Sequence, residues 1–140
     1  METKIYGEAP SQQPYDDLDR VSDLTSLPDT AWHREIDKAV LSVGSDAVKT
    51  AIVCPPTIYG PGRGPGNKRS KQVYLLAKVT LEKGKAPILG KGLTEWDNVN
   101  VHDLSDLFVL LVDAALSKNK DLDGEIWGEK GYFLAENGHQ

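Results

Sequence analysis

The sequence has one cysteine, Cys54, and only three histidines. A single cysteine excludes an intramolecular disulfide and any zinc site built from several thiolates. The histidines lie far apart and do not show the close spacing that is typical of metal ligands; they are His33, His102 and His139. We therefore expect no metal site.

The chain also lacks a long apolar run and an excess of positive charge. No stretch approaches the roughly 20 apolar residues that span a bilayer, and the first four residues, METK, do not begin a signal peptide. The 16 basic and 21 acidic side chains leave a formal net charge of −5, which argues against binding to a phosphate backbone. We expect a cytoplasmic protein that binds neither membranes nor nucleic acid.

What remains is the composition of a folded domain, with 39% hydrophobic and 26% charged residues in 140. Residues 1–30 are polar and interrupted by Pro10, Pro14 and Pro28, so they predict an irregular segment. Residues 31–140 carry the periodic patterns, and we expect them to form the folded part.

Three helices are predicted from apolar residues that recur with a period of 3.6. The first begins at an N-cap on Asp29 or Thr30 and ends at Gly44, and the second runs from Ser70 to Lys83. Their expected inward faces consist of Trp32, Ile36, Ala39, Val40 and Val43 in the first helix, and Leu75, Leu76 and Val79 in the second.

The third helix has the clearest pattern. Asp103 is its expected N-cap, and Asp106, three residues later, has the position of a capping-box residue. Leucine, valine and phenylalanine follow on more than one face between residues 104 and 115. We therefore expect this helix to be buried nearly all round.

Short strands are expected at 48–54, 87–89, 98–101 and 132–135, with a turn at 90–92. The first is a continuous run rich in β-branched residues, which is typical of a strand covered on both faces. Strands alternating with helices predict an α/β fold with a mostly parallel sheet. A parallel sheet that is covered on both faces needs more strands than these, so we interpret the chain as part of a larger domain.

Residues 59–66, with the sequence YGPGRGPG, cannot form regular structure. Their glycines do not have the G-x-G-x-x-G spacing of a dinucleotide-binding turn, and no lysine after a glycine is followed by serine or threonine as in a Walker A loop. We expect no phosphate cradle in this chain.

Two segments nevertheless resemble one family. Residues 50–62, TAIVCPPTIYGPG, are similar to the R-P-x-x-V-Y-G-P-G segment of extended short-chain dehydrogenases, the NAD-dependent epimerase/dehydratase family. Residues 96–104, WDNVNVHDL, are similar to that family's R-D-F-V-H-V-D-D-V segment. The resemblance covers residues 31–135 and corresponds to the C-terminal half of such an enzyme.

The resemblance implies a partial Rossmann-like, doubly wound sheet that lacks the N-terminal dinucleotide-binding βαβ units. It places Cys54 and Pro55 beside the cofactor, NAD or NADP. It also places four side chains on the substrate side, namely Thr57, Tyr59, Arg63 and Asn67. In each case the alternative is a structural role: a buried thiol, a strand end, a packing residue or a solvated loop charge.

Two positions depart from the family pattern. The family's catalytic Y-x-x-x-K spacing falls on His33 and Asp37, where a histidine can exchange protons near neutral pH but an aspartate reverses the charge of the lysine. The alternative is an exposed His–Asp pair one helical turn apart. Trp96 replaces an arginine that binds diphosphates in the family, so a substrate held there would be apolar or neutral. The alternative is that Trp96 packs in the core or at its rim.

Three functions follow as hypotheses. The chain is the substrate-side part of an NAD(P)-dependent oxidoreductase or epimerase that handles a small carbonyl or hydroxyl compound, and is inactive without a complementary N-terminal half. Alternatively, it is a relative without the catalytic pair that binds a small molecule. The third hypothesis is a homodimer or another assembly formed through an unpaired sheet edge.

Overall fold

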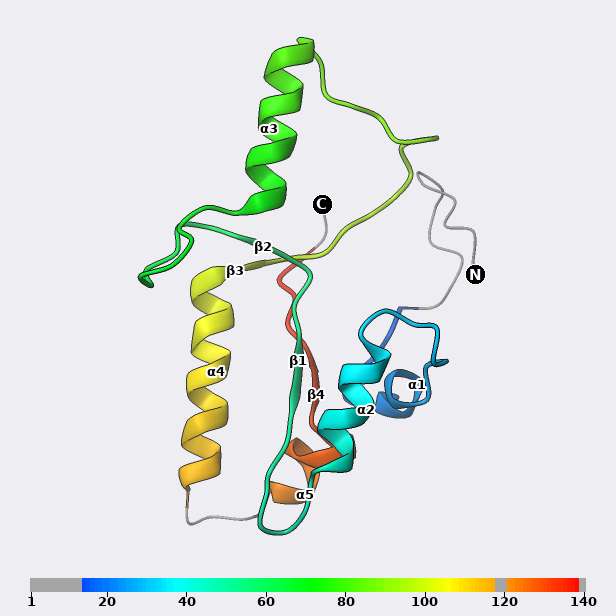
Figure 1. Ribbon diagram of the computed structural model, residues 1–140, viewed down its shortest axis with the longest axis vertical. Helices are drawn as coiled ribbons and strands as arrows, with labels where there is room; N and C mark the ends of the chain where they lie inside the picture. The colour runs from blue at the N-terminus through cyan, green and yellow to red at the C-terminus, as the bar shows by residue number, and fades with distance from the viewer. Residues whose placement is uncertain (1–13, 118–120, 139–140) are drawn as a thin grey trace. The chain divides into compact units, whose positions relative to one another are not determined.

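The computed structural model describes residues 14–117 and 121–138, and it confirms the α/β class. These residues divide into two compact units, one formed by 14–54 and 108–135 and the other by 55–107 and 136–138. The elements, in chain order, are α1 (Val21–Thr25), α2 (Arg34–Ser42), β1 (Ile52–Cys54), β2 (Thr57–Tyr59), α3 (Lys71–Lys83), β3 (Asn98–Asn100), α4 (Val101–Leu116), α5 (Asp123–Ile126), the 3-10 helix η1 (Gly128–Lys130) and β4 (Tyr132–Leu134) (Figure 1).

The first unit is built on a parallel pair, β1 and β4 (Figure 1). Ile52 is opposite Tyr132 and Cys54 is opposite Leu134. The backbone of Ile52 donates to the carbonyl of Gly131 at 2.7 Å, which extends the ladder by one bond. The predicted strands at 48–54 and 132–135 are confirmed, although each is shorter than its apolar run.

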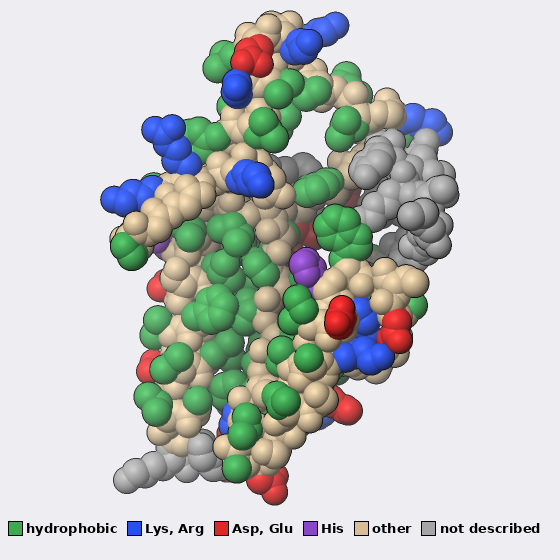
Figure 2. Space-filling model, viewed as in Figure 1, with side chains coloured by type: hydrophobic (Ala, Val, Ile, Leu, Met, Phe, Trp, Pro, Cys, Tyr) green, Lys and Arg blue, Asp and Glu red, His purple; other side chains and the backbone are tan. Residues whose placement is uncertain are grey.

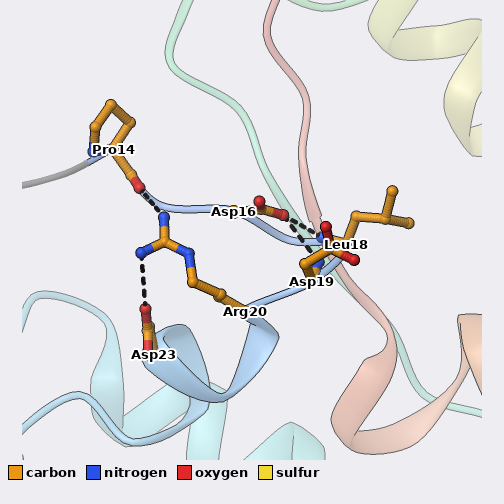
Figure 3. A network of polar contacts seen from close by, with 6 residues as sticks. All are labelled: Pro14, Asp16, Leu18, Asp19, Arg20 and Asp23. Atoms are coloured by element: carbon orange, nitrogen blue, oxygen red, sulfur yellow. Dashed lines mark hydrogen bonds and ion pairs between the residues drawn. The ribbon is translucent and has the colours of Figure 1, made fainter.

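The segment before α1 is fixed to this pair. A carboxylate oxygen of Asp17 accepts a hydrogen bond from the backbone of Leu134 at 2.6 Å. Asp16 accepts the backbone N–H groups of Leu18 and Asp19, both at 2.9 Å, and closes a local turn (Figure 3). Arg20 forms an ion pair with Asp23 at 3.6 Å in α1 (Figure 3). Residues 14–30 of the segment that the sequence marks as irregular therefore include one short helix.

The second unit is built on another parallel pair, β2 and β3, with Thr57 opposite Asn98 and Tyr59 opposite Asn100. Pro55 and Pro56 separate β1 from β2, because proline has no N–H to donate to a ladder. The predicted strand at 98–101 is confirmed as β3. The predicted strand at 87–89 is wrong, since that segment forms no strand; the turn after it is confirmed by a bond from Gly92 to Leu89 at 2.9 Å.

Helix α3 has the predicted ends but not the predicted buried face. The Ser70 hydroxyl caps its N-terminus by accepting from the backbone of Val73 at 3.4 Å, and Gly84 ends it in the left-handed conformation at φ 68°. Leu75 and Leu76 are exposed, so the expectation that they face inward is wrong. Within the described residues no element covers that side of α3.

Helix α4 begins earlier than its aspartates suggest. The side chain of Asn100 accepts the backbone N–H of His102 at 2.9 Å and serves as the cap, so Asp103 lies inside the first turn. The predicted Asp103 cap and Asp106 capping box are therefore wrong. Gly60, at φ 97°, lies against the Asn100 side chain, and a Cβ added there would be 3.1 Å from its amide nitrogen.

Helix α4 is also not buried all round, which corrects a second expectation. Four residues at helical spacing form its covered side: Leu104, Leu107, Leu111 and Ala114. A second apolar stripe, adjacent to the first, is exposed and consists of Phe108, Val109, Val112 and Leu116. The apolar residues on two faces of α4 are present as the sequence predicts, but the described residues cover only one of these two faces.

Helix α2 is in the predicted place but turns its other face inward. Trp32 is 78% exposed and Ile36 61%, whereas Arg34 is 9% exposed and Asp37 7%. Its N-cap is His33 at φ 63°, without a capping side chain, so the expected Asp29 or Thr30 cap is wrong. Trp32, Ile36 and Val43 of the predicted apolar stripe are exposed and Val40 is half-buried, whereas Arg34 and Asp37, which lie between them in the sequence, are engaged inside the unit.

Candidate functional site

The first unit brings together two candidate residues from different parts of the chain and a third that sequence reasoning missed. The hydroxyl of Tyr132, on β4, donates to a carboxylate oxygen of Asp37, on α2, at 3.3 Å. Both residues are buried. This bond holds α2 against β4, so Asp37 has a defined partner within the unit.

Cys54 ends β1 beside this pair. The residue is accessible to solvent, which overturns the expectation of a fully buried thiol. Atoms on its inner side still desolvate the sulfur, and this burial raises the pKa of Cys54, as does the negative charge of Asp37; a hydrogen bond with Tyr132 acts in the opposite direction. The thiol is therefore protonated, and weakly nucleophilic, at neutral pH.

Tyr132 is held in its protonated form. Burial, followed by the nearby Cys54 and Asp37, raises the pKa of Tyr132 well above its ordinary value of 10. The phenol is thus a hydrogen-bond donor at neutral pH, and it donates to Asp37. In the sequence, Tyr132 is marked only as the first residue of the predicted strand at 132–135.

His33 is not brought to this cluster. It is exposed, its ring meets that of Trp32 edge-on with centroids 6.3 Å apart, and its carbonyl accepts the backbone N–H of Asp37 at 3.0 Å. The link between His33 and Asp37 is therefore a backbone bond of the first helical turn. The alternative of an exposed His–Asp pair is wrong for Asp37, because that residue is buried.

Arg34 is a second buried charged residue on α2 that the sequence reasoning missed. One of its terminal nitrogens donates to the carbonyl of Thr25, the last residue of α1. Its Nε and its other terminal nitrogen have no hydrogen-bond partner among the described residues. Arg34 therefore connects α1 to α2. The face of α2 that carries Arg34 and Asp37 is polar and buried, and a search for apolar periodicity cannot detect such a face.

The second unit contains a groove of about 300 Å³ beside the N-terminus of α3. Asn67 lines it, and its side-chain oxygen accepts the backbone N–H of Arg69 at 3.1 Å. The assignment of Asn67 to the substrate side stays a prediction. Three basic residues and no carboxylate line this groove, so its potential favours a negatively charged group. The lining residues are Pro56, Ile58, Gly60, Gly62, Asn67, Lys68, Arg69, Ser70, Lys71, Gln72 and Val101.

The other expected substrate-side residues lie elsewhere in the second unit. Thr57 and Tyr59 flank Ile58 on β2, and successive side chains of a strand point to opposite faces, so Ile58 lines the groove and its two neighbours point away from it. Arg63 is in the exposed loop and Trp96 is 57% exposed before β3; neither lines the groove. Their assignment to substrate stays a prediction.

Among residues 14–117 and 121–138, no three histidine, cysteine, aspartate or glutamate side chains gather as a metal site would require. No helix in that part of the chain combines the length and the apolar character needed to cross a membrane.

Comparison with known proteins supplies the family. Residues 3–123 match the NAD dependent epimerase/dehydratase family. The chain belongs to this family. An "Oxidase ucsJ" from Acremonium sp is 37% identical over 135 residues, which cover 91% of this chain and 39% of that protein. This epimerase/dehydratase-family chain thus spans about two fifths of that relative's length. No solved structure matches it.

The family's cofactor can be tested against the glycines of this epimerase/dehydratase chain. At Gly62 an added Cβ would be 2.8 Å from the carbonyl oxygen of Asn67, and the Gly62 backbone donates to Lys68 at 3.2 Å. The group that lies close to Gly62 is therefore the backbone of the chain's own loop, at Asn67 and Lys68. The residues that the family resemblance places at the cofactor are Cys54 and Pro55, which could line a nicotinamide but offer no cradle for its pyrophosphate.

Proposed function

We propose that this chain forms the substrate side of an NAD(P)-dependent oxidoreductase or epimerase acting on a small carbonyl or hydroxyl compound. The observation that carries the proposal is the family match over residues 3–123, to which a relative described as an oxidase adds support. Because the chain spans 39% of that relative, the activity belongs to the completed domain. The 140 residues alone are proposed to be inactive.

In this proposal the two units contribute separate parts. The first supplies Cys54, at the carboxyl end of β1, where ligands of parallel α/β sheets bind. The second supplies the basic groove that contains Asn67, with Lys68 and Arg69 favouring an anionic group on the substrate. This differs from the neutral substrate expected from Trp96, which lies outside the groove. NAD or NADP, when bound, would accept or donate the hydride, and its pyrophosphate would be held by the rest of the domain.

The test is an assay of this chain completed with the segments of the Acremonium oxidase that lie outside the matched 135 residues. The completed protein is mixed with NAD, NADH, NADP or NADPH and a panel of aldehydes, ketones and secondary alcohols, and reduced nicotinamide is followed by absorbance. We expect substrate-dependent oxidation or reduction of the nicotinamide, and none with the 140-residue chain. Turnover by the chain alone, or tight dinucleotide binding to the completed protein without turnover of any compound, contradicts the proposal.

A second candidate is a relative that binds a small molecule without catalysis. It is favoured by Asp37, which stands where the family has its lysine and is buried against Tyr132. The same assay separates the two candidates. Replacement of Asp37 by Asn leaves turnover of the completed enzyme within about threefold if Asp37 only packs, and a non-catalytic relative shows ligand binding with no turnover in either form.

A further inference from the structure

The first unit contains a cavity at the edge of its sheet that lies away from the candidate cofactor residues. The cavity has a volume of about 380 Å³ and is formed between two segments, residues 44–49 before β1 and residues 123–128 before β4. Because β1 and β4 run parallel, both segments lie at the amino ends of the strands, whereas Cys54 ends β1 at the opposite edge (Figure 1). The cavity is therefore separate from the carboxyl edge, where ligands of parallel α/β sheets usually bind.

Backbone hydrogen bonds fix the two walls of this cavity. The N–H of Gly128, in the second wall, donates to the carbonyl of Thr50, directly after the first wall, at 2.8 Å. Within the first wall, Ser45 and Val48 exchange backbone hydrogen bonds of 2.9 and 3.2 Å and close a tight turn. The cavity is thus formed in advance of any ligand, as is usual for small-molecule sites.

An ion pair joins the two walls and orients an aromatic side chain. Nζ of Lys49 is 3.2 Å from Oδ2 of Asp123, and the indole N–H of Trp127 donates to Oδ1 of the same carboxylate at 3.2 Å. Both oxygens of Asp123 are therefore engaged. Trp127 is the largest apolar side chain in the lining, and the hydrogen bond to Asp123 limits the rotation of its ring.

The charges in the lining do not balance. Lys49 is the cation among the lining residues, whereas Asp46 and Asp123 are both carboxylates. Lys49 neutralises Asp123, so the charge of the exposed Asp46 leaves the cavity negative. Figure 2 shows acidic side chains at the lower tip of the first unit, where the loop before β1 lies. This potential favours a positively charged ligand, and cations are also attracted to the face of a tryptophan ring.

We propose that this cavity is a binding site for a small organic ammonium ion, that is, a protonated amine with a compact apolar body. The ammonium group pairs with the Asp46 carboxylate, and the apolar body packs on Trp127. The volume lies at the low end of the range for small-molecule pockets, which limits the ligand to a compact molecule. An anion is disfavoured, because Lys49 is already paired with Asp123. This inference does not depend on the proposed function, since it requires neither dinucleotide nor hydride transfer.

The test titrates the 140-residue chain with three probes that carry the same phenyl ring. Phenethylamine is protonated at neutral pH, 2-phenylethanol is neutral and 3-phenylpropanoate is an anion. Chemical shifts of the backbone amides measure each affinity and locate the site. We expect saturable binding of phenethylamine, about tenfold tighter than that of 2-phenylethanol, with shifts at residues 44–49 and 123–128. We expect no saturable binding of 3-phenylpropanoate.

Two variants test the two parts of the site. Asp46→Asn should weaken phenethylamine binding about threefold, because charge pairs near the surface are modest. Trp127→Leu should weaken it about tenfold through loss of the aromatic face. Asp19→Asn is the matched control, since it makes the same charge change at an exposed aspartate of the first unit that does not line the cavity, and it should leave the affinity unchanged.

Circular dichroism establishes that the variants are folded, and Asp46→Asn, at an exposed position, decides the case if Trp127→Leu does not fold. The proposal is overturned if phenethylamine shows no saturable binding, or if 2-phenylethanol or 3-phenylpropanoate binds as tightly. It is equally overturned if the shifts lie outside the two walls, or if Asp46→Asn and Asp19→Asn weaken binding to the same extent. None of these results depends on the hydride-transfer assay, so the failure of this proposal and the failure of the proposed function are distinguishable.

Discussion

Tyr132 and Asp37 are joined by a hydrogen bond of 3.3 Å across 95 positions of the sequence. The bond links β4 to α2 inside the first unit, and both side chains are shielded from water. Asp37 falls at a catalytic position of the family pattern, whereas Tyr132 belongs to no motif of that pattern. The stability of the unit should therefore depend on Tyr132.

Replacing Tyr132 with Phe removes the donor and leaves a buried carboxylate without it. We expect a loss of about 1–3 kcal/mol in the free energy of unfolding, the usual cost of an unsatisfied buried polar group. Urea denaturation followed by circular dichroism measures it. Tyr74→Phe, at an exposed tyrosine on α3, is the control and should change stability little. Equal stability of Tyr132→Phe and the wild type would show that the bond contributes nothing.

The raised pKa of Cys54 predicts slow alkylation. Burial and the charge of Asp37 favour the neutral thiol, so iodoacetamide should react more slowly at pH 8 than with a small free thiol, and the rate should rise only at more alkaline pH. Asp37→Asn removes the second cause and should increase the rate at pH 8, but not to that of the free thiol, since burial is the larger cause. A wild-type rate equal to the free thiol's would refute this assignment.

A stability measurement can distinguish the N-cap of α4 seen in the structure, Asn100, from the N-cap expected from the sequence, Asp103. Asn100→Ala should cost about 1 kcal/mol, because the His102 N–H loses its acceptor. Asp103→Ala should cost less, since the Asp103 side chain accepts only a long, exposed bond of 3.5 Å from Asn137. Thermal or urea unfolding of the two variants decides the order. A larger loss for Asp103→Ala would restore the cap that the sequence favoured.

The turn at Asp16 predicts a pH dependence on the acid side. Backbone bonds from Asp19 and Leu18 lower the pKa of Asp16 below its ordinary value of 3.8. A carboxylate with a lowered folded-state pKa stabilises the fold fully above its unfolded pKa, and this contribution disappears as the pH falls through the folded pKa. The protection factors of the Leu18 and Asp19 amides, which compare their exchange rates with those of an unstructured peptide at the same pH, should therefore fall in acid. Asp16→Ala should show low protection factors at every pH, and unchanged protection in that variant would contradict the turn.

Much of the fold could be predicted from the sequence. The limits of α3 follow from Ser70 and Gly84, whose capping chemistry is local, and β1 follows from a short β-branched run before two prolines. The start of α4 was misplaced because three polar side chains stand near it. Only the three-dimensional position of Asn100, against Gly60 and the His102 backbone, shows which one accepts the bond.

The faces of the helices could not be predicted, for a related reason. Periodicity tells which residues share a side of a helix but not which side the rest of the chain covers. In α2 the side with Arg34 and Asp37 is covered, through bonds to Thr25 and Tyr132 that are distant in sequence. Of the three residues that meet in the first unit, Asp37 and Cys54 are ones that the family pattern points to, whereas Tyr132 has no motif around it. The functional roles of Asp37 and Cys54 stay predictions.

The most direct test of the account is a titration of NADH and NADPH into the 140-residue chain, followed by nicotinamide fluorescence, beside the same titration of the completed domain. The chain should give no saturable signal, because Cys54 and Pro55, which the family resemblance places at the cofactor, offer no cradle for a pyrophosphate. The completed domain should bind one dinucleotide. Saturable binding of comparable affinity by the chain alone would show that it carries its own phosphate site. The proposal that the rest of the domain holds the pyrophosphate would then be wrong.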